Sequence, residues 1–65
     1  MNRLQALRRR AGLTQEAAAG KLYVERSTVA KWERGSSKPS LDRLQPLARL
    51  YKVTTDQVID AILAS

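Results

Sequence analysis

The sequence contains no cysteine and no histidine among its 65 residues. Without them the chain has no disulfide framework, no cysteine or histidine zinc site and no histidine for acid–base catalysis. These absences argue against an enzyme. We expect neither a metal nor another cofactor, and no small-molecule ligand is evident.

Long apolar runs are also missing. No stretch approaches the roughly 20 apolar residues that a membrane-spanning helix requires, and the amino-terminal residues lack the apolar core of a secretory signal. The sequence therefore predicts a cytoplasmic protein with no membrane partner.

Positive charge, in contrast, is in excess. Twelve Lys and Arg residues against six Asp and Glu give a formal net charge of +6. Such a balance suits a polyanionic partner, although it also fits a merely soluble basic surface, because net charge bears on association and not on fold. The short chain leads us to expect one domain over residues 1–65 with a small, mostly helical core.

Apolar residues at helical spacing divide the chain into five segments, which predicts an all-α fold. Gly12 and Gly35 are favoured residues for helix ends, and Thr14, Ser40 and Thr54 are favoured amino-terminal caps. The expected helices are Asn2 to Ala11, Gln15 to Leu22, one after Val24 that runs to Arg34, Leu41 to Tyr51, and one that opens with a capping box of Thr54 and Gln57.

Two charged residues fall on the apolar faces of these segments. Arg8 shares the stripe of Leu4 and Leu7, and Glu33 lies four residues beyond Val29. A long buried cation must find an acceptor, and a carboxylate at the carboxyl end of a helix opposes the helix dipole. The periodicity therefore predicts a partly buried Arg8–Glu33 ion pair; the alternative is two unrelated, exposed charges.

The last segment has a broad apolar face that carries Val58, Ile59, Ile62 and Leu63. Some of these side chains must complete the core. We expect the surplus, Ile62 and Leu63, to pair two copies of the chain. A frayed terminal helix is the alternative.

The second and third segments are typical of a helix-turn-helix, because they are short, closely connected and expose Arg26, Ser27 and Lys31 on the later helix. Specific motifs strengthen this interpretation. They are LTQE from Leu13, STV from Ser27, KWERG from Lys31, PSL from Pro39 and the Leu47-Ala48 pair. With them, the stretch from Leu13 to Ile59 resembles the Xre family, the DNA-binding domain of Cro and phage repressors.

The resemblance implies a compact, five-helix, repressor-like domain whose helix-turn-helix unit occupies residues 14–34, with the third helix in the major groove of double-stranded DNA. It also implies an arginine–glutamate pair between the first and third helices. The base-reading positions match Arg26, Ser27, Thr28 and Lys31. The DNA-backbone positions match Gln15, Trp32, Arg34, Ser36, Ser37 and Lys38. Trp32 is expected mainly in the core, with its indole N–H as a donor to phosphate.

Five residues depart from the family pattern. Tyr23 stands where the turn usually has glycine, which predicts strain or an altered turn. Ala18 replaces a larger aliphatic residue, and Gly20 inside a helix costs about 1 kcal/mol relative to alanine. Glu25 replaces the usual Ser or Thr cap and either accepts from a cytosine amino group or repels phosphate. Pro46 predicts a kink or a looser first turn.

From these features we expect a sequence-specific transcriptional regulator of bacterial or phage origin, a repressor that binds an inverted repeat as a homodimer. One alternative is a protein-interaction module of a regulatory or toxin–antitoxin complex, against which the exposed Arg26, Ser27 and Lys31 argue. Another is a basic amphipathic peptide on a membrane surface. The basic residues, however, are spread over several segments and do not gather on one helix face.

Overall fold

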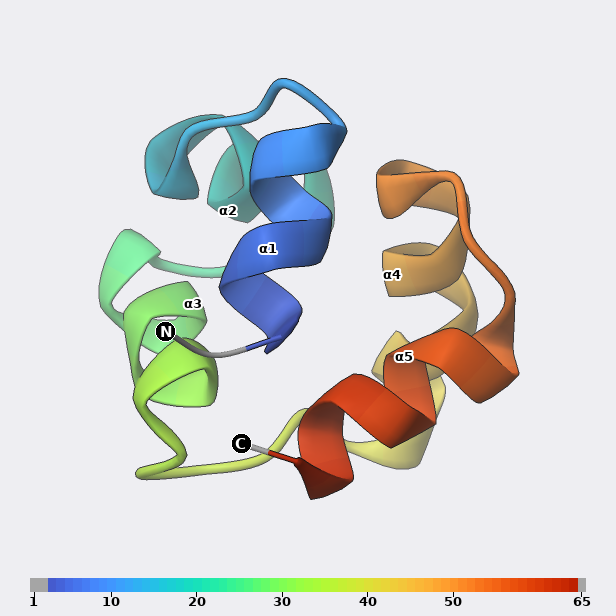
Figure 1. Ribbon diagram of the computed structural model, residues 1–65. Coiled ribbons are helices and arrows are strands. Elements are labelled where there is room, and N and C mark those ends of the chain that lie inside the picture. The colour runs from blue at the N-terminus through green and yellow to red at the C-terminus, as the bar shows by residue number, and fades with distance from the viewer. Residues whose placement is uncertain (1–2, 65) are drawn as a thin grey trace.

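A computed structural model describes residues 3–64 of the chain. Over these residues it contains five α-helices, one short 3-10 helix and no strand, so the fold is all-α, as predicted (Figure 1). The elements are α1 (Arg3–Arg10), α2 (Gln15–Leu22), α3 (Arg26–Arg34), η1 (Leu41–Arg43), α4 (Leu44–Tyr51) and α5 (Thr55–Leu63). The expected start of the first helix at Asn2 lies outside the described residues.

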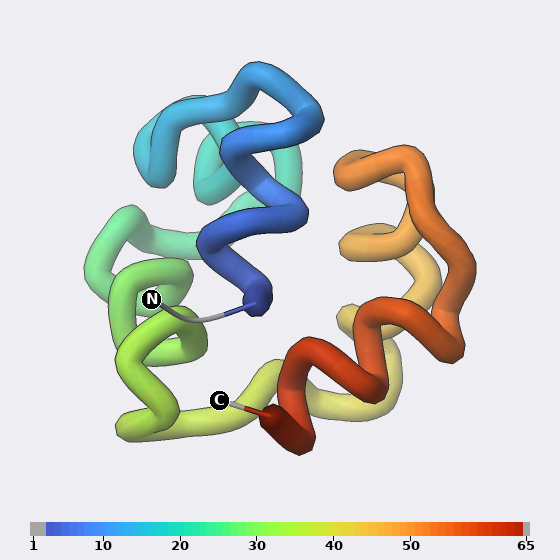
Figure 2. Tube along the Cα trace, in the orientation of Figure 1, coloured from blue at the N-terminus to red at the C-terminus, as the bar shows by residue number. Residues whose placement is uncertain are grey.

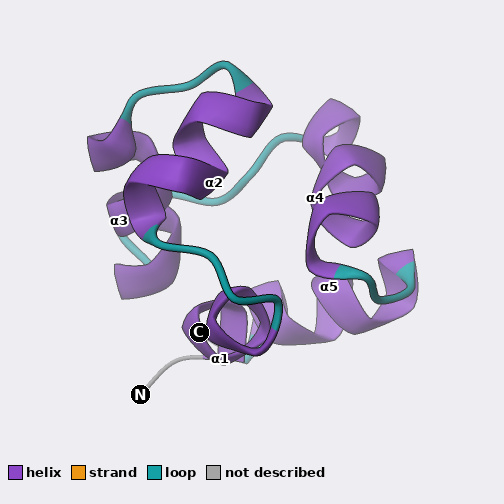
Figure 3. Ribbon diagram, turned by 90° about the horizontal axis from the view of Figure 1, so that it is seen from above, coloured by secondary structure: helices purple, strands orange, loops and turns teal. Residues whose placement is uncertain are grey.

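The helices form two groups with α1 between them (Figure 1). α2 and α3 lie on one side and α4 and α5 on the other, and the Cα trace in Figure 2 and the view from above in Figure 3 show the same division. α1 packs against α3, α4 and α5, while α2 packs against α3 and α4. None of the helices in residues 3–64 combines the length and apolar character needed to cross a membrane.

One core joins all five helices. Leu47, Val29 and Val58 are its largest fully buried side chains, and they come from three different helices. Ala18 and Ala19 are also buried, and their small side chains let α2 approach its neighbours closely. The replacement of a larger aliphatic residue by Ala18 is therefore accommodated by close helix packing.

Two helices begin with the caps that the sequence predicts. The Thr14 hydroxyl accepts a hydrogen bond from the Ala17 N–H at 3.0 Å. At the start of α5, the Gln57 N–H donates to Thr54 Oγ1 at 3.1 Å and the Thr54 N–H donates to Gln57 Oε1 at 2.9 Å. This reciprocal capping box satisfies two backbone donors that the first turn of a helix otherwise leaves free.

The start of the fourth helix differs from the prediction. Ser40 makes no cap bond to the backbone, and residues Leu41–Arg43 form a 3-10 turn before α4 begins at Leu44. The Ser40 hydroxyl instead donates to the carboxylate of Asp42, which lowers the pKa of Asp42. Pro46 is the third residue of α4, where a helix needs no N–H from it. In place of a looser first turn, the chain forms a separate 3-10 turn, and α4 begins late enough that Pro46 costs it no hydrogen bond.

Arg43 makes a contact that no sequence motif predicts. Its Nη1 donates to the carbonyl oxygen of Leu22 at 2.8 Å. Leu22 is the last residue of α2, so the guanidinium satisfies a free carbonyl and lies at the negative end of the helix dipole. The contact fixes η1 against the end of the helix that supports α3.

Candidate nucleic-acid interface

Helix α3 has two distinct faces. Val29, Trp32 and Glu33 are buried against the rest of the domain. Arg26, at the amino-terminal end of the helix, and Lys31, on the side opposite the buried residues, are exposed. An anchored helix with cations on its free face can enter a groove without losing its own packing.

The four residues predicted to read bases lie together on the first turns of α3. Arg26, Ser27 and Lys31 are exposed, and Thr28 is partly buried. Glu25 precedes the helix in an extended conformation and makes no side-chain cap bond. The weaker cap that Glu25 predicts is therefore observed, and its carboxylate is exposed at the same end of α3.

Tyr23 forms the turn that orients α3 against α2. Its backbone is left-handed, with φ 59° and ψ 40°, and its N–H reaches the carbonyl groups of Ala19 and Gly20. The turn therefore keeps the geometry that glycine favours, and the strain expected from a side chain at this position follows. The phenol ring is 92% exposed and gains no packing in return.

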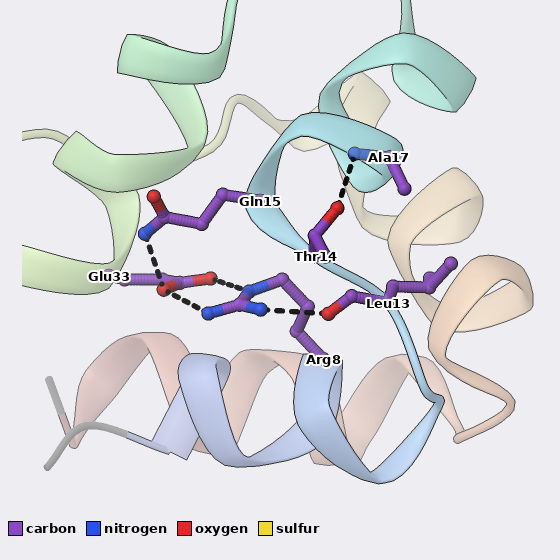
Figure 4. Close-up of polar contacts among 6 residues, drawn as sticks. All are labelled: Arg8, Leu13, Thr14, Gln15, Ala17 and Glu33. Carbon is purple, nitrogen blue, oxygen red and sulfur yellow. Dashed lines mark hydrogen bonds and ion pairs between the residues drawn. The ribbon is translucent and has the colours of Figure 1, made fainter.

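An ion pair between Arg8 and Glu33 links α1 to α3 (Figure 4). Arg8 Nε donates to Glu33 Oε2 at 2.6 Å and Nη2 donates to Oε1 at 3.1 Å, so the pair is bidentate. The third nitrogen, Nη1, donates to the carbonyl oxygen of Leu13 at 2.8 Å. Both side chains are 7% exposed, and the hydrogen bond to Glu33 raises the pKa of Arg8. The structure thus contains the pair predicted from helical periodicity.

Gln15, the first residue of α2, joins this network. Its Nε2 donates to Glu33 Oε1 at 3.0 Å, as Figure 4 shows. The sequence predicts Gln15 to be a DNA-backbone contact but gives no sign of this internal bond. The bond occupies one N–H of the amide and holds the side chain against α3, while the second N–H remains as a donor.

A groove of about 580 Å³ opens where α1 and α2 meet the start of α3. Arg9, Gln15 and Arg26 line it, together with Arg8, Gln5, Thr14 and Glu16. No sequence motif singles out Arg9, because its place beside Arg26 depends on how the helices pack. The groove adds Arg9 to the cations that border the exposed face of α3.

The positions predicted to follow the DNA backbone divide into exposed and buried ones. Gly35 ends α3 in a left-handed conformation, with φ 79°. The exposed members are Arg34, Ser36, Ser37 and Lys38, which lie at the end of α3 and in the connector that follows. Trp32, in contrast, is 6% exposed and lies in the core. Its packing role is observed, and little of the indole remains for a phosphate.

The two residues predicted to pair copies of the chain lie in different environments. Ile62 is 8% exposed and belongs to the core, whereas Leu63 is 72% exposed. The expectation that Ile62 is surplus to the core is therefore wrong. Val58 and Ile62 share one face of α5 at helical spacing and point inward, while Ile59 and Leu63 share the adjacent, exposed face.

Three features together define a DNA-binding domain of the helix-turn-helix class. They are the buried Arg8–Glu33 pair, the tight turn at Tyr23 and the exposed basic residues of α3. The helix-turn-helix family model matches residues 4–58. The chain therefore belongs to the Xre-type helix-turn-helix family of DNA-binding transcriptional regulators, and its class is not enzymatic. No solved structure matches the chain.

Similar proteins carry the same functional description. The chain is 39% identical over 57 residues to the HTH-type transcriptional activator BcrR of Enterococcus faecalis. The matched residues make up 88% of the chain and 28% of that protein. It is 42% identical to the uncharacterized HTH-type transcriptional regulator YobD of Bacillus subtilis, and the match covers 88% of the chain and 51% of that protein. It is 39% identical to the HTH-type transcriptional regulator ImmR of Bacillus subtilis, and the match covers 88% of the chain and 45% of that protein. The chain thus spans about half the length, or less, of these relatives.

Proposed function

We propose that this chain is a sequence-reading domain that inserts α3 into the major groove of double-stranded DNA. The observation that carries the proposal is the division of α3 into a buried face and an exposed face with Arg26, Ser27 and Lys31. The relatives named as transcriptional regulators support a regulatory role.

Arg26 is the strongest candidate for base recognition. It is the first residue of α3 and is exposed, so its side chain extends from the end of the helix that leads into the groove. A guanidinium can donate to O6 and N7 of one guanine at the same time. Lys31, five residues further along the helix, supplies a point charge that suits either a guanine or a phosphate.

The flanking residues are proposed to hold the domain on the sugar-phosphate backbone. Exposed donors at the end of α3 and in the connector after it come from Arg34, Ser36, Ser37 and Lys38. Arg9 and the free N–H of Gln15 supply donors before α3. Contacts of this kind set register and affinity but carry no sequence information of their own.

The finer proposal is a homodimer that represses transcription from an inverted repeat. Half-sites about 10 base pairs apart place two recognition helices on one face of the duplex. Repression requires only that the protein occupies its site, whereas activation needs a further contact with the transcription machinery. A reporter gene placed downstream of the selected site distinguishes the two modes by the direction of its response.

Selection of bound sequences from random duplex DNA at near-physiological salt tests the function directly. We expect an enriched inverted repeat. A single enriched half-site would support base reading by a monomer. If no sequence were enriched, the base-reading proposal would be wrong, and a protein-interaction module would become the better interpretation.

Two substitutions separate base reading from backbone binding. Arg26→Ala should weaken binding to the selected site by about 1–3 kcal/mol and leave binding to random DNA almost unchanged, because a specific base contact is lost. Lys38→Ala should weaken binding to both DNAs alike. Fluorescence anisotropy with the two duplexes measures both effects. An equal loss for Arg26→Ala on the two DNAs would reassign Arg26 to the backbone.

A further inference from the structure

A second basic groove opens between α1 and α5, apart from the groove at the start of α3. It consists of two adjoining clefts of about 340 and 150 Å³, which share Leu7 and Arg10. The larger cleft lies between α1 and α5, and the smaller one continues past the end of α1 to the connector between α4 and α5. We call the two clefts together the α1–α5 groove; its charged side chains are Arg3, Arg10, Lys52 and Asp60.

The cations of the α1–α5 groove are available to a ligand. Arg3 and Arg10 lie seven residues apart on α1, so they share one face of that helix, and Lys52 lines the far end of the groove. All three are exposed, and within residues 3–64 none of them forms an ion pair. Asp60, on the α5 side, is exposed and unpaired in the same range. The groove therefore favours a ligand that carries negative charge.

The floor of the α1–α5 groove is apolar. Leu7 and Val53 are partly buried and pack against the core, and Ala6 lies between the two arginines in the sequence and lines the same cleft. The α5 side adds a hydrogen-bond donor. Gln57 Oε1 accepts from the Thr54 N–H, so the amide NH₂ of Gln57 is free to donate to a ligand carbonyl group. A ligand with apolar groups and carbonyl oxygens among its negative charges fits this lining.

Lys52 occupies a position where glycine would be less strained. Its φ is 59° and its ψ is 46°, and its N–H reaches the carbonyl groups of Ala48 and Arg49 at the end of α4. This left-handed conformation costs energy for a residue with a side chain, and the exposed ammonium makes no ion pair within the described residues that would offset the cost. Strained residues of this kind gather at functional sites. The strain therefore supports a role for the Lys52 side chain in the groove.

We propose that the α1–α5 groove binds an extended, acidic peptide segment of a protein partner. Seven residues of helix place Arg3 and Arg10 about 10 Å apart along the axis of α1. Two residues three positions apart in an extended peptide also span about 10 Å. Carboxylates at that spacing meet both guanidinium groups, which bind carboxylates with two hydrogen bonds each. An apolar residue between the carboxylates then contacts Leu7.

The groove suits a peptide better than a second nucleic acid. A phosphate chain brings negative charge at every residue and no apolar side chain for the floor, and Asp60 repels it. The groove also lies apart from the proposed DNA surface. Figure 1 shows α1 between α3 and α5, and Arg9, next to Arg10 in the sequence, borders the groove at the start of α3 instead. A peptide in the α1–α5 groove therefore leaves the exposed face of α3 free.

Fluorescence anisotropy with a labelled synthetic peptide tests the proposal. The probe is an extended peptide with two aspartates three positions apart and leucines between them, and its control has asparagine in place of both aspartates. We expect the control to bind about tenfold or more weakly, because two charged contacts are lost. Amide shifts in the NMR spectrum should change at Leu7, Arg10 and Val53 and stay constant at Arg26 and Lys31. No binding of the acidic probe at millimolar concentration, or shifts confined to α3, would overturn the proposal.

Two arginine variants separate a specific site from general charge attraction. Arg10→Gln should weaken binding of the probe by about fivefold, because Arg10 lines both clefts. Arg49→Gln is the matched control: Arg49 is exposed on α4 and lines neither cleft, so its loss should leave the affinity almost unchanged. Circular dichroism verifies that both variants are folded. Equal losses in the two variants would overturn the proposal.

Lys52→Gly tests whether the strained lysine serves the groove. This variant should resist urea better than the wild type, because glycine relieves the left-handed backbone, and should bind the probe about threefold more weakly. Probe affinity equal to that of the wild type would remove Lys52 from the site.

A random DNA duplex tests the other class of ligand. Its affinity should be the same for Arg10→Gln and for the wild type, and a loss as large as that for the probe would assign the groove to nucleic acid and overturn the proposal. The peptide measurements need no DNA. They therefore fail independently of the proposed function, which the DNA selection tests.

Discussion

Tyr23 holds a backbone conformation that costs energy for any residue with a side chain. Its φ of 59° lies in the left-handed region, and its exposed ring makes no compensating contact with the core. Tyr23→Gly should therefore raise the free energy of unfolding by about 1 kcal/mol. Urea denaturation measures the change.

Gly12 provides the opposite control for this prediction. It has a φ of 75°, and a Cβ added there would meet no atom within 4 Å. Gly12→Ala should therefore be destabilising through backbone strain alone. If Tyr23→Gly also lowered stability, the tyrosine side chain would have to contribute more than its exposure indicates.

The ionisation of Tyr51 makes the stability of the domain depend on pH in the alkaline range. Burial of the phenol, and next the nearby charge of Glu33, raise the pKa of Tyr51 to about 12, compared with about 10 in an unfolded chain. Between these values the unfolded chain releases the proton and the folded chain keeps it. The contribution of the protonated Tyr51 to the free energy of unfolding is thus complete below pH 10. It is lost as the pH rises toward 12, by about 1.4 kcal/mol per pH unit.

The Tyr51→Phe variant isolates this effect from other alkaline titrations. The difference in unfolding free energy between wild type and variant should be constant below pH 10. Between pH 10 and 12 the wild type should lose stability relative to the variant. Urea titrations at a series of pH values measure the difference. A difference independent of pH throughout this range would show that the ring ionises equally in both states.

At the scale of elements, the Arg8 guanidinium connects three parts of the chain. It bonds Glu33 of α3 and the carbonyl oxygen of Leu13 in the connector, and Glu33 in turn accepts from Gln15 of α2. Glu33→Gln leaves the buried cation uncompensated and should lower the free energy of unfolding by about 3–5 kcal/mol. Thermal and urea denaturation followed by circular dichroism measure the loss.

A double substitution separates charge from shape in this network. Arg8→Met combined with Glu33→Leu removes both charges and keeps apolar volume, so it should recover most of the stability that Glu33→Gln loses. Arg9→Gln, at the exposed neighbouring position, should change stability by less than about 0.5 kcal/mol. Equal effects of Glu33→Gln and Arg9→Gln would mean that the pair contributes little.

For the molecule as a whole, the sequence predicted most of what depends on local periodicity. The spacing of Leu4, Leu7 and Arg8 placed Arg8 on the inner face of α1, and the Thr54–Gln57 box placed the start of α5. Both features depend on residues within one or two helical turns, where geometry is fixed by the helix itself. The stop at Gly35 is a third example.

What the sequence did not predict depends on how distant elements pack. The bond from Arg43 to the Leu22 carbonyl, the place of Arg9 beside Arg26 and the burial of Ile62 all follow from tertiary arrangement. A broad apolar stripe such as that of α5 does not reveal which of its edges faces the core. The division between Ile62 and Leu63 becomes clear only when α1 and α4 are in place.

The separation of Arg8 from Glu33 along the chain has a consequence for protein synthesis. Arg8 emerges from the ribosome well before its carboxylate partner, which follows 25 residues later. Until α3 has emerged, burying the guanidinium would leave its charge uncompensated, so early collapse around α1 is penalised. We therefore expect the nascent chain to stay open until the second half of the network is available, and the domain then to close as one unit.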